Sequence, residues 1–178
     1  MQAADVSHLV DEYGADIYRY CCRLSRSSAD ADDLYQQTFL KCLELTFALD
    51  EAQNPKAFLF SVVGGIWKNE LRKNTRRTLL IRPVSLDDPD APTPSDPHCT
   101  DSSAAQRAQN ETLLRAIQTL APKFRIPITL AYGFDCGLKQ IAKIEKVPIG
   151  TIKSRLHKAR QLLKKEMEAQ GYGSAEVL

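Results

Sequence analysis

The stretch LKQIAKIEKVPIGTIKSRLHKARQLLKK, residues 138–165, decides the fold that the sequence predicts. On a helical wheel its apolar side chains from position 152 onward fall into one narrow stripe: Ile152, Leu156, Ala159 and Leu163. The opposite side carries hydrogen-bonding side chains, with two arginines on its flanks: Lys153, Ser154, His157, Lys158 and Gln161, then Arg155 and Arg160. A helix with one thin apolar stripe and a broad donor face suits a groove lined by phosphates and base edges.

A shorter helix precedes this basic one, because apolar residues recur at helical spacing over 138–145. Residues 145–147 are too few for anything but a turn, and Pro148 opens the second helix, predicted over 148–168. A short helix, a tight turn and a basic helix together predict a helix-turn-helix, which is a DNA-binding motif. The alternative is an ordinary helical hairpin whose basic face is only solvated.

The distribution of charge along the chain is more informative than the net charge of +2. Residues 1–55 carry four basic and ten acidic side chains, whereas residues 56–82 carry seven basic and one acidic. Residues 83–106 carry five acidic side chains and no basic one, and residues 107–178 carry thirteen basic and six acidic. Two basic blocks separated by an acidic segment indicate a polyanion that is bound at two places.

Helical patterning covers most of the chain, and the alternating pattern of β-strands is nearly absent. Helices are predicted over residues 5–26, 31–48, 55–77, 109–120, 123–132, 138–145 and 148–168. Between the third and fourth of these, a segment rich in Pro, Ser, Thr and Asp buries too little apolar surface to fold. We therefore expect an all-α fold with two small helical domains, 1–82 and 109–178, joined by a flexible, acidic, proline-rich linker, 83–108.

The predicted helix 55–77 carries a second basic stripe on the side away from its apolar arc: Ser61, Gly64, Gly65, Lys68, Asn69, Arg72 and Lys73. Two consecutive glycines inside a helix cost about 1 kcal/mol each, which suggests that another molecule closely approaches their exposed backbone. A helix break or kink at this point is the alternative. With Phe60 and Trp67 beside it, the stripe suits single DNA strands, whose phosphates meet cations and whose bases stack on aromatic rings.

The predicted helix 31–48 starts with the acidic cluster 30–33, in which Asp30 is expected to cap the helix. Capping explains this cluster better than a pair of catalytic carboxylates does. One polar strip of the helix contains a single leucine in its middle: Asp33, Gln36, Gln37 and Leu40. A solvated face also explains such a strip, so it is weak evidence for a partner when taken alone.

The five cysteines, at positions 21, 22, 42, 99 and 136, form no C-x-x-C pair. An odd count without a signal peptide indicates reduced thiols and a cytoplasmic protein, and we expect neither a metal site nor a cofactor. The longest apolar run, 59–67, is far short of the roughly 20 residues of a membrane span, so direct membrane insertion is not expected. The sequence has no nucleophile motif, so we predict no catalytic residues and no enzyme activity.

Two groups of motifs give a more specific prediction. The segments DADDLYQQTFLK (30–41) and KAFLFSVVGGIWKNELRK (56–73) resemble the second conserved domain of bacterial sigma factors. Residues 120–160, with LAPKFRIPITL, LKQIA and VPIGTIKSRLHKAR, resemble their fourth domain, and this two-domain plan is similar to that of the extracytoplasmic-function sigma factors of the sigma-70 family. The resemblance implies an alternative sigma factor that directs core RNA polymerase to specific promoters and helps to open them for transcription initiation. It also implies an anti-sigma factor as a partner.

The resemblance implies roles for individual residues as well. Core RNA polymerase would be bound by Asp33, Gln36, Gln37 and Leu40. The minus-ten element would be bound and melted by Ser61, Gly65, Lys68, Asn69, Arg72 and Lys73. The minus-thirty-five element would be bound by Lys153, Ser154, Arg155, His157, Lys158 and Arg160. The acidic linker would run through the RNA exit path of the polymerase.

Several residues depart from the family pattern. Gly64 and Gly65 replace an Arg-Asn pair, Glu145 takes a usually apolar place, and Lys146 stands where Gly is typical, which predicts a strained residue at positive φ. A rival interpretation is a stand-alone helix-turn-helix regulator that binds a palindrome as a dimer. An enzyme that uses the carboxylates of 30–33 or a cysteine is a further alternative, for which the sequence offers no supporting motif.

Overall fold

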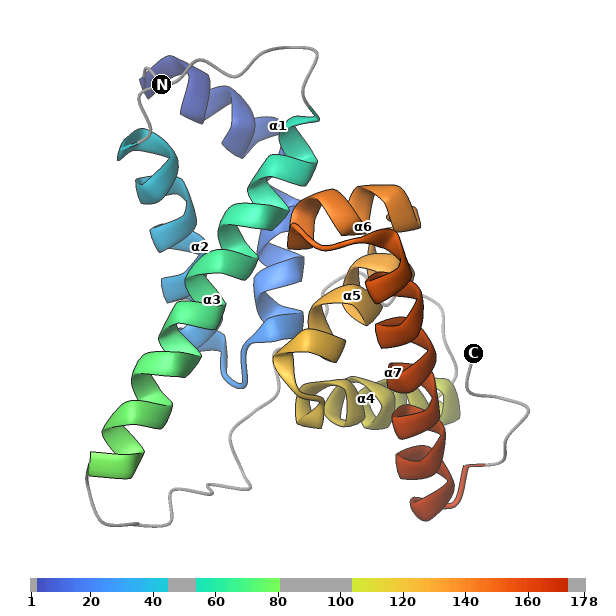
Figure 1. The fold of residues 1–178 in the computed structure, drawn as a ribbon. Helices are drawn as coiled ribbons and strands as arrows, with labels where there is room; N and C mark the ends of the chain where they lie inside the picture. The colour runs from blue at the N-terminus through green and yellow to red at the C-terminus, as the bar shows by residue number, and fades with distance from the viewer. Residues whose placement is uncertain (1–2, 45–53, 81–103, 173–178) are drawn as a thin grey trace. The chain divides into compact units, whose positions relative to one another are not determined.

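The computed structural model describes residues 3–44, 54–80 and 104–172, and within these ranges every regular element is an α-helix (Figure 1). The helices there are α1 (Ala3–Leu24), α2 (Ser28–Glu44), α3 (Pro55–Leu80), α4 (Ala104–Thr119), α5 (Pro122–Gly133), α6 (Leu138–Glu145) and α7 (Ile149–Ala169). The predicted all-α class is confirmed. Each predicted helix corresponds to an observed one, and α6 has the predicted bounds.

The chain divides into two compact units, unit 1 (Met1–Thr93) with α1–α3 and unit 2 (Pro94–Leu178) with α4–α7. Most of the predicted linker 83–108 lies outside the described residues. Its last residues are helical, because α4 begins at Ala104 in a run of Ala, Gln and Arg that favours helix. The limits of the two domains and the flexibility of the linker stay predictions.

Unit 1 is a three-helix unit in which α1 packs against α2 and α3, and α2 packs against α3. All three helices contribute fully buried side chains: Ile17, Tyr20 and Leu24 from α1, Leu34 from α2, and Leu59 and Phe60 from α3. The rings of Tyr20 and Phe60 meet edge to face with their centroids 4.9 Å apart, a geometry that adds to the gain from burial. This core fixes the outward faces of α2 and α3, where predicted site residues lie.

The start of α2 differs from the prediction. Ser27 Oγ accepts a hydrogen bond from the backbone N–H of Asp30 at 3.2 Å, and the Ser27 carbonyl accepts one from Ala31 at 3.1 Å. Ser27 is therefore the N-cap, and the prediction of Asp30 in this role was wrong. Asp30 lies in the first turn of α2, where its negative charge is stabilised by the helix dipole.

Unit 2 is built around α7, which packs against α4, α5 and α6. Its fully buried aliphatic side chains come from three helices: Ile126, Ile128 and Leu130 from α5, Ile141 from α6, and Ile152 and Leu163 from α7. Pro122 begins α5, a position where its missing N–H leaves no bond unmade. The side of α7 that faces away from α4, α5 and α6 is exposed at Lys153, Ser154, His157 and Lys158.

Candidate nucleic-acid interface

The helix-turn-helix consists of α6, a tight turn and α7. Lys146 ends α6 in the left-handed conformation, with φ 54° and ψ 45°, as the sequence predicted for this position. The N–H of Lys146 is bonded to the Lys143 carbonyl at 3.3 Å, and the N–H of Val147 to the Ala142 carbonyl at 3.1 Å. Pro148 then forms the N-cap of α7. The turn thus uses carbonyls at the end of α6 that would otherwise lack a partner.

The two faces of α7 agree with the helical wheel. The predicted apolar stripe is buried and continues to Met167 at the end of the helix: Ile152, Leu156, Ala159, Leu163 and Met167. Four of the six residues predicted to bind the minus-thirty-five element are exposed: Lys153, Ser154, His157 and Lys158. Ser154 Oγ donates to the Thr151 carbonyl at 3.0 Å, and His157 contacts Gln161 at 3.0 Å through a ring nitrogen.

The other two predicted residues, Arg155 and Arg160, lie on the flanks of α7 and each contacts another helix. Arg155 Nη1 lies 3.3 Å from Glu145 Oε2 at the end of α6, and only 3% of the Glu145 side chain is exposed. Arg160 Nη1 donates to the hydroxyl of Tyr132 on α5 at 3.0 Å. Sequence reasoning identified Glu145 as unusual but missed its partner, and it missed Tyr132, because both pairs join residues from different helices.

The predicted minus-ten stripe lies on α3, which runs without interruption through Gly64 and Gly65, so the alternative of a helix break is wrong. Gly65 is exposed, and a Cβ atom built on it would have nothing within 4 Å. Gly64, however, is buried, so its predicted place on an exposed stripe was wrong. Asn69 and Arg72 are exposed and lie one turn apart, with Arg72 Nη1 3.4 Å from Asn69 Oδ1.

The remaining stripe residues differ in exposure. Ser61 and Lys68 are half-buried, and Lys73 is exposed. The aromatic rings predicted to stack on DNA bases beside this stripe are not available for stacking, because Phe60 is 0% and Trp67 is 5% exposed. Both rings belong to the core of unit 1, and this part of the prediction was wrong. Because α3 packs against both α1 and α2, more of its circumference is buried than a helical wheel centred on one apolar face predicts.

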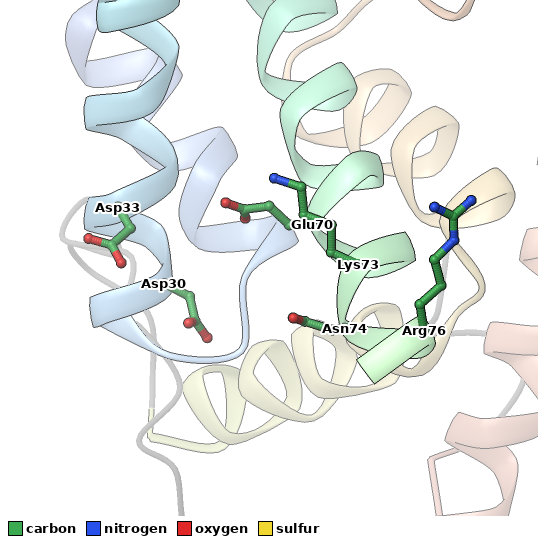
Figure 2. A pocket seen from close by; sticks show the side chains of 6 residues that line it. All are labelled: Asp30, Asp33, Glu70, Lys73, Asn74 and Arg76. Atoms are coloured by element: carbon green, nitrogen blue, oxygen red, sulfur yellow. The ribbon is translucent and has the colours of Figure 1, made fainter. Parts of the chain in front are cut away.

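A pocket of about 510 Å³, lined by charged and polar residues, lies between α2 and α3. Figure 2 shows Asp30 and Asp33 extending from α2, and Glu70, Lys73, Asn74 and Arg76 extending from α3. Three carboxylates and two cations share this pocket, so it has no strong potential of one sign. Lys73, predicted to contact DNA, therefore lies among carboxylates that reduce its attraction for phosphate.

The predicted polymerase-binding strip lies on the outward face of α2. Asp33, Gln36 and Gln37 are exposed, and Leu40 has 59% of its surface exposed. Leu43, one turn further along, is 44% exposed, so two leucines present apolar surface beside the polar residues. An apolar centre with a polar rim is the usual composition of a protein-binding patch.

The cysteines that the structure describes have packing roles. Cys21, Cys42 and Cys136 are buried and Cys22 is half-buried, whereas Cys99 lies outside the described residues. Burial raises the pKa of the Cys21 thiol, and it raises that of Cys42 to about 11, so both stay protonated at neutral pH. Among the described residues no group of His, Cys, Asp and Glu could hold a metal ion. None of the described helices combines the length and apolarity needed to span a membrane.

Comparison with known proteins covers both units. The family model "Sigma-70 region 2" matches residues 9–77 and the model "Sigma-70, region 4" matches residues 110–163, together more than half of the chain. The ECF RNA polymerase sigma factor SigL of Mycobacterium tuberculosis is 28% identical over 172 residues, covering 96% of this chain and 93% of the relative. SigW of Bacillus subtilis, also an ECF RNA polymerase sigma factor, is 24% identical over 168 residues, covering 89% of this chain and 87% of the relative.

Solved structures show the same fold. The sigma factor RpoE of Bartonella quintana, crystallised with the anti-sigma factor NepR, matches with a TM-score of 0.71 at 23% identity, covering 92% of this chain and 97% of that one. CnrH, solved with the cytosolic domain of CnrY, matches with a TM-score of 0.63 at 16% identity, covering 94% and 90%. With both conserved regions present and in order, this chain belongs to the extracytoplasmic-function sigma factors of the sigma-70 family, which are not enzymes and which direct transcription initiation by RNA polymerase.

Proposed function

We propose that this chain gives core RNA polymerase its promoter specificity by binding the minus-thirty-five element through the exposed face of α7. The observation that carries the proposal is the contrast between the two faces of this helix. One face is buried in unit 2, and the other presents Lys153, Ser154, His157 and Lys158 to solvent. In the major groove, these donors would reach base edges, while Arg155 and Arg160 on the flanks would contact phosphates.

In the same proposal, unit 1 binds the minus-ten element as the duplex opens. Gly65, Asn69 and Arg72 supply an exposed part of α3 on which the backbone is accessible and two polar side chains are available. Ser61, Lys68 and Lys73 complete this surface. Because Phe60 and Trp67 are buried, backbone and phosphate contacts carry the binding here rather than stacking on these two rings.

The partners in this proposal are core RNA polymerase, promoter DNA and an anti-sigma factor, all in the cytoplasm. Core polymerase would bind Asp33, Gln36, Gln37 and Leu40 on α2. An anti-sigma factor is supported by the two solved structures of similar fold, of which one contains NepR and the other the cytosolic domain of CnrY. The domains 1–82 and 109–178 would act at the two promoter elements, and the acidic linker 83–108 would connect them through the RNA exit path.

Transcription in vitro with core polymerase of the same bacterium on a genomic promoter library tests the proposal. The full chain should start transcripts at sites that core polymerase alone does not use, and these sites should share two elements at a fixed spacing. Stable dimers that bind a palindrome without polymerase would instead support a stand-alone helix-turn-helix regulator. Size-exclusion chromatography and a gel shift without polymerase distinguish the two outcomes.

A further inference from the structure

Both arginines on the flanks of α7 are bonded to side chains from other helices of unit 2. Arg155 Nη1 lies 3.3 Å from Glu145 Oε2 of α6, and Arg160 Nη1 donates to the Tyr132 hydroxyl of α5 at 3.0 Å. The helices that carry these partners, α5 and α6, both pack against α7. Each guanidinium is therefore held at one nitrogen by the scaffold that positions the whole helix-turn-helix.

The first pair is enclosed and the second is open to solvent. The Glu145 side chain is 3% exposed while that of Arg155 is 24% exposed, so the carboxylate is covered and part of the Arg155 side chain reaches solvent. A carboxylate that is removed from water needs its cation in place, because an unpaired buried charge is strongly unfavourable. Tyr132 is 51% exposed and Arg160 is exposed, so this hydrogen bond lies at the surface of unit 2.

Each of these two contacts uses only one nitrogen of the guanidinium group. A guanidinium has five N–H donors in a planar fork, and its geometry matches a phosphate with two parallel hydrogen bonds. Among the described residues, the only hydrogen-bond partner of the Arg155 guanidinium is Glu145 and that of the Arg160 guanidinium is Tyr132. Lys153 and Lys158, on the exposed face between them, have no such side-chain partner within the described part of the chain.

We propose that Glu145 and Tyr132 are positioning residues, which orient Arg155 and Arg160 in advance for phosphates on the two sides of the groove that α7 enters. The proposal rests on the proposed function of α7 in promoter binding. An arginine that is already oriented loses less side-chain freedom when it binds, an advantage of about 2- to 10-fold in affinity for each side chain. Phosphate contacts also fix the register of a reading helix on the duplex, so correct orientation affects specificity as well.

Tyr132→Phe tests one half of the proposal without changing any charge or removing a buried group. The assay is binding of holoenzyme, made from the full chain and core polymerase, to a labelled duplex whose promoter was selected with wild-type holoenzyme. We expect binding about 2- to 10-fold weaker with an unchanged salt dependence, because Arg160 still neutralises its phosphate. Arg160→Ala should lower the slope of log K against log salt by about one. Adding Tyr132→Phe to Arg160→Ala should then change nothing further.

Glu145→Gln tests the other half, with a scrambled duplex of the same composition as the second probe. Removal of the carboxylate should weaken promoter binding by disorienting Arg155, yet strengthen binding to scrambled DNA by removing a negative charge, so the ratio of the two affinities should fall at least threefold. Glu145→Gln in an Arg155→Ala background should leave that ratio unchanged. Thermal unfolding of each variant checks that the fold is retained.

The outcomes separate this inference from the proposed function. If Arg160→Ala leaves both affinity and salt slope unchanged, Arg160 contacts no phosphate and its positioning by Tyr132 is overturned. If Lys158→Ala also leaves promoter preference unchanged, the proposed function of α7 fails as well. Suppose instead that Arg160→Ala lowers the salt slope. If Tyr132→Phe then leaves promoter affinity unchanged, or weakens it equally with and without Arg160, only positioning by Tyr132 is overturned. A Glu145→Gln variant that tightens binding to both duplexes equally overturns positioning by Glu145. Because Tyr132 is exposed, its variant remains informative even if Glu145→Gln fails to fold.

Discussion

At the scale of single residues, two helical glycines of unit 1 occupy opposite environments. A Cβ atom built on Gly14 would lie 2.8 Å from the Tyr35 hydroxyl, whereas one built on Gly65 would have no neighbour within 4 Å. The ring of Tyr35 meets Tyr18 and Phe39 edge to face, with centroids 5.6 Å and 5.0 Å away, so it has little room to move. Gly14 therefore permits the packing of α1 on α2, and Gly65 has no such packing role.

Alanine at each glycine should consequently have opposite effects on stability. Gly65→Ala should raise the free energy of unfolding by about 0.5–1 kcal/mol, because alanine favours the helix and meets no obstacle. Gly14→Ala gains the same propensity but crowds Tyr35, and overpacking costs about 1–3 kcal/mol, so we expect net destabilisation. Urea unfolding followed by circular dichroism measures both. A Gly14→Ala variant as stable as Gly65→Ala would contradict the tight contact.

Asp16 gives unit 1 a predictable dependence on pH. Burial disfavours its carboxylate, but hydrogen bonds from Lys56 on α3 and Arg19 on α1 outweigh this and lower the pKa of Asp16 below its ordinary value. Because the folded state binds the proton less readily than the unfolded state, the contribution to stability is complete above the ordinary pKa, about 3.9. It is lost as the pH falls through the lower, folded-state value.

Asp16→Asn should remove this acid-dependent part and cost about 1 kcal/mol at pH 7, since the ion pairs are only partly shielded from solvent. The measurement is urea unfolding of wild type and variant between pH 2 and pH 7. The two curves should converge at the acid end. A constant difference over the whole range would mean that Asp16 acts through packing and not through its charge.

At the scale of elements, the turn between α6 and α7 is strained at Lys146, which has φ 54°. Lys146→Gly should therefore stabilise unit 2, by about 0.5–1 kcal/mol after the greater freedom of glycine in the unfolded chain is subtracted. Asp135, between α5 and α6, has φ 49° and provides a matched control. Aspartate tolerates this conformation better than lysine, so Asp135→Gly should gain less. Equal gains in thermal unfolding would contradict a particular strain at Lys146.

Substitutions on the exposed face and on the flank of α7 should impair DNA binding in two different ways. Lys158→Ala, on the exposed face, should relax sequence preference at one base pair by about 1–3 kcal/mol. Arg160→Ala, on the flank, should weaken binding evenly across sequences and flatten its salt dependence. Binding of holoenzyme to a set of single-base promoter variants at several salt concentrations measures both effects. Identical profiles for the two variants would show that face and flank do not differ in role.

Some elements could be predicted from the sequence because their causes are local. The bounds of α6 follow from apolar spacing, and the positive φ of Lys146 was expected because the resemblance places Lys146 where Gly is typical. The cap of α2 was misassigned because Ser27 and Asp30 are both capping residue types within one turn. The sequence alone does not show which of them folds back onto the helix.

Other features depend on how helices pack and could not be obtained from one helix at a time. The burial of Phe60, Gly64 and Trp67 depends on α1 and α2 covering α3 from two sides. The Arg155–Glu145 and Arg160–Tyr132 contacts join residues 10 and 28 positions apart. A helical wheel places Arg155 and Arg160 on the flanks of α7, but it does not show which neighbouring helix lies beside each of them.

At the scale of the whole molecule, the predicted functions are divided between the two units. Polymerase binding is assigned to α2 in unit 1 and binding of the minus-thirty-five element to α7 in unit 2. Each unit has its own buried core, so a surface substitution in one unit should leave the fold of the other intact. This division makes it possible to remove one function while the other is retained.

Leu40→Ser provides the decisive test of this division, because Leu40 is 59% exposed and its loss should change stability by no more than about 0.5 kcal/mol. If Leu40 and Leu43 form the apolar centre of the polymerase-binding patch, the substitution should weaken binding to core polymerase about tenfold or more. Fluorescence anisotropy of the labelled chain titrated with core polymerase measures this affinity. Lys158→Ala should leave it unchanged while altering promoter preference. Equal loss of polymerase affinity in both variants would require that unit 2 also binds core polymerase, and the assignment of that contact to α2 alone would be wrong.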